Sequence, residues 1–525
     1  EEIVTQAIKI IGDVKYQIKS DDLIPFLKHK SLRIQLHAIE AIGRIKLKNA
    51  VNDIIENIRI NNNKDLLLRH AAIIALSRVA TSEELAKYYN DDSDAVKIAC
   101  VVALRRLNSP LIDIYLKDSN EFIVTEASRA INDDYSIEES LPTLANLINK
   151  TEFDNEGFIR RSLNANSRVG KLNNIQNLID FSTKSTNDEL MRVESINILS
   201  NWESPSKHDR VDGRYRGEIN RNNNSVRKLF GQNAFELLYD KSESVRVASI
   251  KALSSLKITS LDTILISFLK KDTSKYIRQQ SLITLLENNS YNSEIIFDIA
   301  SNDTSKIVRT ELLKHISKTS LQDETKASFL INIYKKGSYE EKQESINQLK
   351  LINKDQVKFF FSGLTDSLIN NTILPEISLE AFKSLDYFPK LKFKLENTFS
   401  DTLTPYYYTL FGGDQKKGID IYYNNISAQC TRCHAIGGNN QKLVGPNLKN
   451  LSNRLTRTQI LESLILPSKE IASGYGTATF DLNDNTEIYG KIIEVNNYNT
   501  FVDIGNGEII PILNSKIINQ TNHIS

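Results

Sequence analysis

The chain has 525 residues, of which 40% are hydrophobic and 25% are charged, with 66 Lys and Arg against 65 Asp and Glu. This balance is typical of a soluble globular protein, and it argues against a basic nucleic-acid-binding surface and against an acidic disordered tail. No run approaches eighteen apolar residues, so we expect no membrane span. Three cysteines are too few for a disulfide framework in a chain of this size.

Residues 1–404 repeat one pattern, in which an apolar residue precedes Arg or Lys and small or apolar residues follow at helical spacing. Arg246, Arg278 and Arg309 mark three successive copies. The loops before two of them repeat literally as Asp-Thr-Ser-Lys, at 272–275 and 303–306. Two helices per repeat of this length predict an α-solenoid, and the pattern resembles HEAT repeats, of which we expect about eleven.

The repeated Arg is interpreted as structural, because charge on a helix face usually pairs with a neighbour or faces solvent. We expect a ladder of ion pairs between these arginines and the Asp of the adjoining loops. A helix is predicted over 260–271, with Thr259 and Asp262 as a capping box. His29, His37, His70 and His315 are isolated in the sequence, so the solenoid is predicted to be a scaffold without a catalytic site.

A long loop at 203–225 interrupts the period and is rich in Pro, Gly, Asn and charged residues. Long loops in compact arrays are usually either functional or disordered. Two interpretations stay open: an elaborated surface loop, or a docking element that grips another domain. The candidate docking residues are Trp202, Asp209, Arg210, Asp212, Arg214, Tyr215 and Arg216.

The chemistry is concentrated in residues 405–525, where Cys430, Cys433 and His434 form the motif Cys-x-x-Cys-His. This is the attachment signature of a c-type haem. Two thiols one helical turn apart can form thioethers with one porphyrin, and the adjacent imidazole then lies under the iron. We therefore predict one covalent haem c, bound through Cys430 and Cys433, with His434 as the metal ligand.

Two other interpretations of the motif are weaker. A thioredoxin-like redox pair requires a βαβ context that is lacking here. A zinc site requires four ligands, and no further Cys or His occurs nearby except His523.

The residues around the motif fit a small cytochrome. The segment 443–448 resembles the Gly-Pro-x-Leu segment of c-type cytochromes, which implies that Gly445, Pro446 and Leu448 adjoin the haem and that the Pro446 carbonyl binds the proximal imidazole. Helices are expected before the motif, over 412–423, and after it, over 454–476 with an end at Pro467. Residues 477–513 alternate like strands and predict a β-meander of three or four strands.

Together these features resemble the PVC-type haem-binding proteins, whose longer members carry a β-propeller of the PQQ-dehydrogenase kind. The resemblance implies a mainly α fold: a HEAT-like solenoid (1–404), then a small c-type cytochrome domain (405–525) with a β-insert (477–513). In that family a distal Met follows the insert. The resemblance therefore implies that the Met lies beyond Ser525 and that the chain is a truncated piece of a longer protein. His523 is the alternative sixth ligand within the chain, whereas Met191 belongs to the solenoid.

The expected function is electron transfer, with the haem as the electron-accepting module of a larger exported dehydrogenase. The expected partner is a redox protein or an upstream dehydrogenase domain, and no nucleic acid is expected. Thioether attachment implies a periplasmic or otherwise exported location, with a signal upstream of Glu1. No independent catalytic site is seen. A haem-based ligand sensor and a pure interaction scaffold remain open as alternatives.

Overall fold

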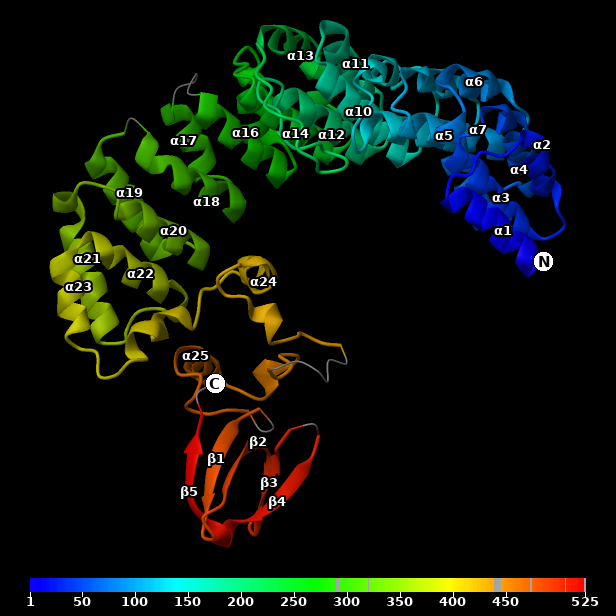
Figure 1. Cartoon of the computed structure of the whole chain (residues 1–525). Helices are drawn as coiled ribbons and strands as arrows, with labels where there is room; N and C mark the ends of the chain where they lie inside the picture. The colour runs from blue at the N-terminus through cyan, green and yellow to red at the C-terminus, as the bar shows by residue number, and fades with distance from the viewer. Residues whose placement is uncertain (289–292, 320, 439–444, 473–474, 506, 524–525) are drawn as a thin grey trace. The chain divides into compact units, whose positions relative to one another are not determined.

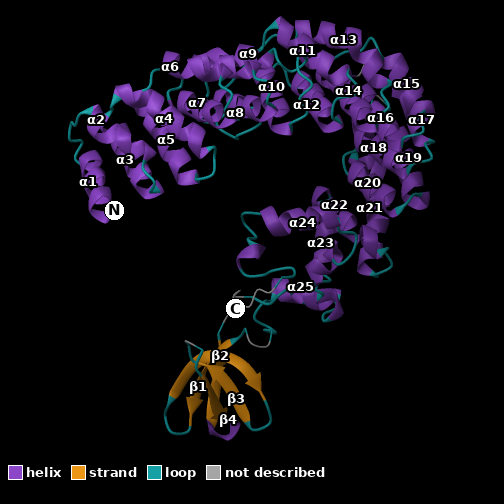
Figure 2. Ribbon diagram, turned by 90° about the vertical axis from the view of Figure 1, so that its right-hand side faces the viewer, coloured by secondary structure: helices purple, strands orange, loops and turns teal. Residues whose placement is uncertain are grey.

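The computed structural model describes residues 1–288, 293–319, 321–438, 445–472, 475–505 and 507–523. Internal contacts divide the chain into two compact units, Glu1–Val308 and Arg309–Ser525. Helices make up most of the first unit, and the second contains helices followed by a five-stranded sheet (Figures 1 and 2). No helix in the described part of the chain is long and apolar enough to cross a membrane.

The first unit is an array of helices. They are α1 (Glu2–Asp13), α2 (Ser20–Leu23), α3 (Leu32–Ile45), α4 (Val51–Asn61), α5 (Leu66–Val79), α6 (Ser82–Ala86), α7 (Asp94–Arg106), α8 (Glu121–Asn132), α9 (Leu141–Ala145), α10 (Glu156–Val169), α11 (Leu172–Thr183), α12 (Glu189–Ser200), α13 (Asn224–Leu238), α14 (Glu243–Ser255), α15 (Asp262–Lys271), α16 (Lys275–Asn288) and α17 (Ser293–Ser301). The division between the units falls within α18 (Lys306–His315).

The second unit continues the helices and then changes character. Its helices are α19 (Asp323–Lys336), α20 (Tyr339–Leu349), α21 (Lys354–Ile369), α22 (Ser378–Ser384), α23 (Pro389–Glu396), α24 (Gln415–Asn424) and α25 (Arg457–Ile465). Its strands are β1 (Thr477–Leu482), β2 (Glu487–Val495), β3 (Asn499–Asp503), β4 (Ile509–Leu513) and β5 (Ile517–Asn522).

Successive repeats stack through one row of helices, as an α-solenoid requires. Helix α3 packs against α1 on one side and against α5 on the other, and α5 packs against α7. Glycines permit the closest approaches. A Cβ atom on Gly12 would lie 2.8 Å from the Cα atom of Ala41, and one on Gly43 would lie 2.9 Å from the Cα atom of Ala75. Any larger residue would push these neighbouring helices apart.

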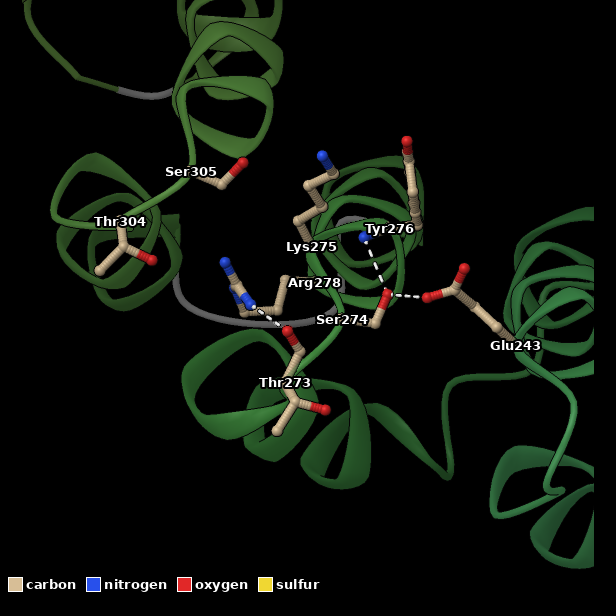
Figure 3. A pocket seen from close by; sticks show the side chains of 8 residues that line it. All are labelled: Glu243, Thr273, Ser274, Lys275, Tyr276, Arg278, Thr304 and Ser305. Carbon is tan, nitrogen blue, oxygen red and sulfur yellow. Dashed lines mark hydrogen bonds between the residues drawn. The ribbon is translucent and has the colours of Figure 1, made fainter.

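The expected ladder of ion pairs is confirmed for Arg246 and Arg278, whereas Arg309 pairs with Glu341 of α20. Arg246 pairs with Asp272, and Arg278 pairs with Asp303 through N···O distances of 2.7 and 2.9 Å. Figure 3 shows Thr273, Ser274 and Lys275 of one loop and Thr304 and Ser305 of the next around one pocket, with Arg278 donating to the Thr273 carbonyl. The Arg278 guanidinium also donates to the Asp272 carbonyl at 2.8 Å. Arg246 and Arg278 therefore each tie their own repeat to the loop that opens the next one.

The capping box expected at Thr259 is wrong. Helix α15 begins at Asp262, its N-cap is Leu261, and no side chain caps it. The Asp262 amide instead donates to the Thr259 carbonyl in a turn, and its carboxylate accepts from Asn288 of the next repeat at 3.3 Å. The Asp262 side chain, which the sequence pattern predicted to be part of the cap, therefore binds the next repeat instead.

The loop at 203–225 packs on repeats of its own unit. The Asp209 side chain is fully buried and accepts from the Asn164 amide at 3.0 Å and from the Arg216 guanidinium at 3.3 Å. Burial alone would raise the pKa of Asp209. Hydrogen bonds from the Val211 and Asp212 amides and from Asn164, together with the charge of Arg216, outweigh it and hold this pKa below its usual value.

Two arginines of this loop close the ends of two neighbouring helices. Arg216 donates to the Asn132 and Asp134 carbonyls at 2.9 and 2.8 Å, at the end of α8. Arg221 donates to the Ser167 and Arg168 carbonyls at the end of α10, and its guanidinium lies over the ring of Trp202, 4.8 Å from the centroid. Carbonyls at helix C-termini have no partner within the helix, so Arg216 and Arg221 supply donors to these groups, and Arg168 also donates to the Asn132 carbonyl at 3.3 Å.

These contacts assign the buried members of the predicted docking cluster to the solenoid itself. Trp202 is only 2% exposed, whereas Tyr215 is 64% exposed. Docking to another domain stays a prediction for the exposed side chains alone.

The β-insert is larger than expected. Strands β1 to β4 fall within 477–513, as predicted, and β5 lies beyond that range. The strand order is β4-β3-β2-β1-β5, with every neighbouring pair antiparallel (Figure 1). Ala478, Phe480, Leu482, Val502 and Ile512 form its core. Asn506, in the predicted turn between β3 and β4, lies outside the described residues.

Candidate functional site

The Cys-x-x-Cys-His motif follows helix α24 in a short, well-defined turn. The Asp414 side chain caps α24 by accepting from the Lys416 and Lys417 amides. Gln429, with a φ of 45°, reverses the chain, and the 3₁₀ helix η10 (Cys430–Arg432) follows. The Cys433 and His434 amides both donate to the Cys430 carbonyl, at 3.3 and 3.0 Å. One helical turn therefore separates the two thiols.

Both motif cysteines are free and reachable, unlike the third. Cys433 is exposed and Cys430 is partly exposed. Cys100 is buried in α7, where burial raises the pKa of its thiol to about 12. A thiol of that kind is inert, because the thiolate is the reactive form. The reactive thiols of the chain are thus the two of the motif.

The imidazole of His434 is held by the loop at 445–448. Its Nδ1 atom donates to the Pro446 carbonyl over 2.9 Å. This is the contact that the resemblance to c-type cytochromes implies. With the proton on Nδ1, the Nε2 atom keeps its lone pair, which is the form in which an imidazole binds a metal.

Gly445 allows this approach. A Cβ atom at that position would lie 2.7 Å from Cε1 and 2.9 Å from Nδ1 of the His434 ring, and 3.0 Å from the Cys433 carbonyl oxygen. Real Cβ atoms do not come so close to other atoms, so a side chain here would displace the ring or the loop. Only glycine lets the backbone pass against the imidazole.

The two segments of the site are joined by backbone hydrogen bonds. The Gly445 amide donates to the Cys433 carbonyl at 2.9 Å, and the Leu448 amide donates to the Ala435 carbonyl at 2.7 Å. The Asn447 side chain bridges both segments, because it accepts from the Gly437 amide and donates to the Gly437 carbonyl. The structure therefore brings together all six residues predicted for the site. Leu443 and Val444, which open the predicted segment, lie outside the described residues.

One contact at the site was not predicted from the sequence. The Tyr422 hydroxyl, on α24, donates to the His434 carbonyl at 2.9 Å. Burial raises the pKa of Tyr422, so its hydroxyl stays protonated and able to donate. Only the helical spacing from α24 to the motif hinted at this contact, and spacing alone does not show where a hydroxyl points.

The segment around the motif has little core of its own. Among the described residues from 415 to 470, only Ala435 and Leu461 are buried. Large apolar side chains remain at least half exposed, namely Ile419, Ile421, Tyr423, Ile426, Ile436 and Leu464. Such exposure is unfavourable for a folded segment, and a large apolar group bound there would relieve it.

These observations fit a covalently attached haem. Two reachable thiols stand one turn apart, and the imidazole beside them has a fixed tautomer. The glycine makes room against that ring, and the surrounding segment lacks an apolar centre. No group of three or more Cys, His, Asp or Glu side chains that could hold a bare metal ion occurs in the described ranges.

The candidate sixth ligands are engaged elsewhere. The Nε2 atom of His523 lies 2.8 Å from the Thr479 hydroxyl, and its ring packs edge-on against Tyr489. Met191 is buried in α12 of the first unit. His523 must therefore break a hydrogen bond within the sheet before it can bind a metal.

Side chains of the last helical repeats contact the chain that leads into the motif segment, and Arg457 after the motif contacts the same stretch. The Ser378 hydroxyl of α22 donates to the Tyr408 carbonyl, and the rings of Phe382 and Tyr408 stack with centroids 4.7 Å apart. Arg457, at the start of α25, donates to the Leu410 carbonyl at 2.8 Å. The chain on either side of the site, at Tyr408 and at the start of α25, is thus held by defined contacts.

No family model and no curated protein sequence matches the chain. Solved structures with a similar course of the chain include Kap121p bound to RanGTP, at a TM-score of 0.46 and 9% identity over 76% of this chain and 50% of that one. Importin beta in an ammonium sulfate condition has a TM-score of 0.33 and 10% identity, over 74% of this chain and 57% of importin beta. The chain thus spans about half the length of these proteins. Likenesses this remote carry no argument about function.

Proposed function

We propose that the chain binds one haem c covalently and transfers electrons, as a PVC-type haem-binding protein of the kind that its motifs resemble. Cys430 and Cys433 would hold the porphyrin as thioethers, and the Nε2 atom of His434 would bind the iron. A bound haem supplies a one-electron redox centre. The helical array is the scaffold that carries this centre, in an exported protein that serves a larger dehydrogenase.

The observation that carries this proposal is the hydrogen bond from His434 Nδ1 to the Pro446 carbonyl. It fixes the ring orientation and the tautomer before any iron is bound. Partners of this kind raise the basicity of a metal-binding imidazole, and their loss typically lowers metal affinity by about 10- to 100-fold. The imidazole beside the two reachable thiols is therefore already oriented as a metal ligand would need to be, which supports the proposal.

The residues around His434 have different positioning roles. Gly445 leaves the space that the ring needs, and Asn447 and Leu448 hold their loop against Ala435 and Gly437. Tyr422 ties the His434 carbonyl to α24, so the motif moves with that helix. These side chains orient the ligand and supply no chemistry of their own.

The experiment is expression of the full chain behind an export signal, together with a c-type haem maturation system. A c-type absorption spectrum that is lost in Cys430→Ala/Cys433→Ala supports the proposal. The matched control is Cys100→Ala, which removes the buried thiol and should leave the spectrum unchanged. A chain that folds but incorporates no haem would leave the interaction scaffold as the function.

A ligand sensor is the second candidate, favoured by the engagement of His523 with Thr479. An iron without a strong sixth ligand is high-spin and open to small gases. Addition of CO to the reduced protein tests whether the iron is open. A low-spin spectrum that CO does not change favours the electron carrier, with a sixth ligand from these residues. A shift with CO fits both the sensor and a carrier whose distal Met comes from downstream residues, and repeating the measurement with those residues added separates the two.

A further inference from the structure

Charge is distributed unevenly within the second unit. The described residues from 414 to 470 carry seven Lys and Arg, all exposed, against four Asp and Glu. The sheet residues from 477 to 523 carry six Asp and Glu against only Lys491 and Lys516. The chain as a whole is almost neutral, so the segment around the motif is basic and the neighbouring sheet is acidic.

Most of the basic side chains around the motif lack a carboxylate partner. In the described part of 414–470, Lys469 forms an ion pair, with Glu462. The other six cations have no carboxylate oxygen within 4 Å, namely Lys416, Lys417, Arg432, Lys449, Arg454 and Arg457. The acidic groups are used locally, since Asp414 caps α24 and Asp420 accepts from Asn424.

These cations lie where the redox centre is proposed. Arg432 stands between the two cysteines of the motif. Lys449 follows Leu448, whose amide binds the motif segment, and Arg454 donates to the Asn447 carbonyl at 2.8 Å. Lys416 and Lys417 begin α24, which packs against η10.

In the solenoid, the repeated arginines Arg246 and Arg278 are paired with Asp272 and Asp303 in the ladder. Around the motif, Arg432, Arg454 and Arg457 donate to uncharged oxygen atoms of Gln429, Asn447 and Leu410, so their charge is not neutralised by a carboxylate. Like charges in a short segment repel one another, and charge of one sign that no nearby carboxylate neutralises is suited to recognising a partner of the opposite sign.

We propose that this basic segment docks an acidic redox protein through carboxylates around the partner's own redox centre. The inference rests on the proposed function, because it names the chemistry of the partner for that same site. The sheet residues carry net negative charge and would repel the same partner, so attraction is confined to the basic segment. Such forces act mainly on the association rate and weaken as salt is added, since the screening length is about 8 Å at physiological ionic strength.

Binding of fluorescently labelled poly-L-glutamate to the full chain tests the docking surface over a series of salt concentrations. The charge variant is Lys416→Gln/Lys417→Gln/Lys449→Gln. The matched control removes three exposed solenoid lysines, as Lys184→Gln/Lys228→Gln/Lys251→Gln. We expect Kd to rise by about tenfold or more in the charge variant, to stay unchanged in the control, and to rise with salt in the wild type. Equal affinities in the two variants, or binding that ignores salt, would overturn the proposal.

The same binding experiment also tests two other possible partners of the basic segment, namely nucleic acid and a second copy of the chain. Tighter binding of a single-stranded DNA oligonucleotide than of poly-L-glutamate of equal charge would overturn the assignment to an acidic protein. So would self-association of the wild type at low salt that the charge variant abolishes, because the acidic sheet of a second copy would then be the partner.

A failure of docking and a failure of the proposed function can be told apart, because poly-L-glutamate binding does not require haem. The absorption spectrum is recorded on the same samples. A haem-free chain that still binds poly-L-glutamate through Lys416, Lys417 and Lys449 supports docking and contradicts the redox function. A haem-loaded chain with no difference between the two variants contradicts docking alone.

Discussion

The Nδ1 atom of His434 and the carbonyl oxygen of Pro446 lie 2.9 Å apart, in a hydrogen bond that crosses from the motif to the loop at 445–448. The carbonyl can only accept, so the proton is on Nδ1 and the opposite nitrogen is free to bind a metal. Every residue predicted for the site lies within this small region. The following predictions test whether the region has the role that its geometry suggests.

Substitution of Gly445 by Ala should damage the site without unfolding the chain. Its Cβ atom would lie 2.7 Å from the His434 ring, so the ring must rotate away from Pro446. We expect haem occupancy to fall by about tenfold or more, or the spectrum to show altered axial ligation, as for the loss of a partner that orients a metal ligand. Gly413→Ala is the control, because a Cβ atom there meets no atom within 4 Å. Equal haem spectra for the two variants would contradict the positioning role of Gly445.

The three cysteines should differ sharply in reactivity. In haem-free, folded protein at pH 8, iodoacetamide should modify Cys430 and Cys433 and spare Cys100, whose pKa burial raises to about 12. In haem-loaded protein no cysteine should react, because both motif sulfurs are then thioethers. Peptide mass spectrometry reads both results. Modification of Cys430 in the haem-loaded chain would show that the thioether is absent.

Arg216→Ala should release the loop at 203–225. The substitution removes the nearer cation of the buried Asp209 carboxylate, leaving Arg168 at 3.7 Å, and it takes one of two donors from the Asn132 carbonyl at the end of α8. Loss of a hydrogen bond to a buried charged group costs about 1.5 to 3 kcal/mol. Arg210→Ala, at the partly exposed contact with Glu194, should cost less than about 1 kcal/mol. Trp202 is the chain's only tryptophan and is buried beside Arg221, so its fluorescence during urea unfolding reports on this loop. Similar unfolding midpoints for both variants would contradict the bracing role.

The same loop should be sensitive to acid. The folded-state pKa of Asp209 is lowered, so its contribution to stability is fully present above about pH 4, the ordinary pKa of an unfolded aspartate, and is lost as the pH falls through the folded value. Asp209→Asn removes this dependence. The urea midpoint read by Trp202 should therefore fall more steeply below pH 4 in the wild type than in the variant. Parallel curves would show that Asp209 does not titrate in this range.

The helical repeats could be predicted because each repeat contains the same helical spacing of apolar residues. Val245, Ala248, Ala252, Leu253 and Leu256 lie on one stripe, and all are buried in or just after α14. Strand β5 was missed because Ile517 to Asn522 is mostly polar and exposed, with no alternation to detect. It forms a strand because it pairs with the free edge of β1, and the sequence of residues 517–522 alone does not predict this pairing.

The candidate site was predictable where chemistry fixes spacing, and not elsewhere. The interval between Cys430, Cys433 and His434 is the one that attachment to a porphyrin would require. Gly445 and Pro446 lie where the imidazole needs space and a hydrogen-bond acceptor. The contacts of Tyr422, Arg216 and Arg221 depend instead on the positions of backbone carbonyls that are distant in the sequence. Such partners become visible only once the helices are placed.

The most direct test of the central claim is mass spectrometry of tryptic peptides from the full chain, matured with a c-type haem system and then denatured. The account predicts one haem per chain, still attached after denaturation and carried by the peptide that contains Cys430 and Cys433. A chain whose haem is removed by acid and acetone, or whose Cys430 and Cys433 are recovered as free thiols, would contradict it.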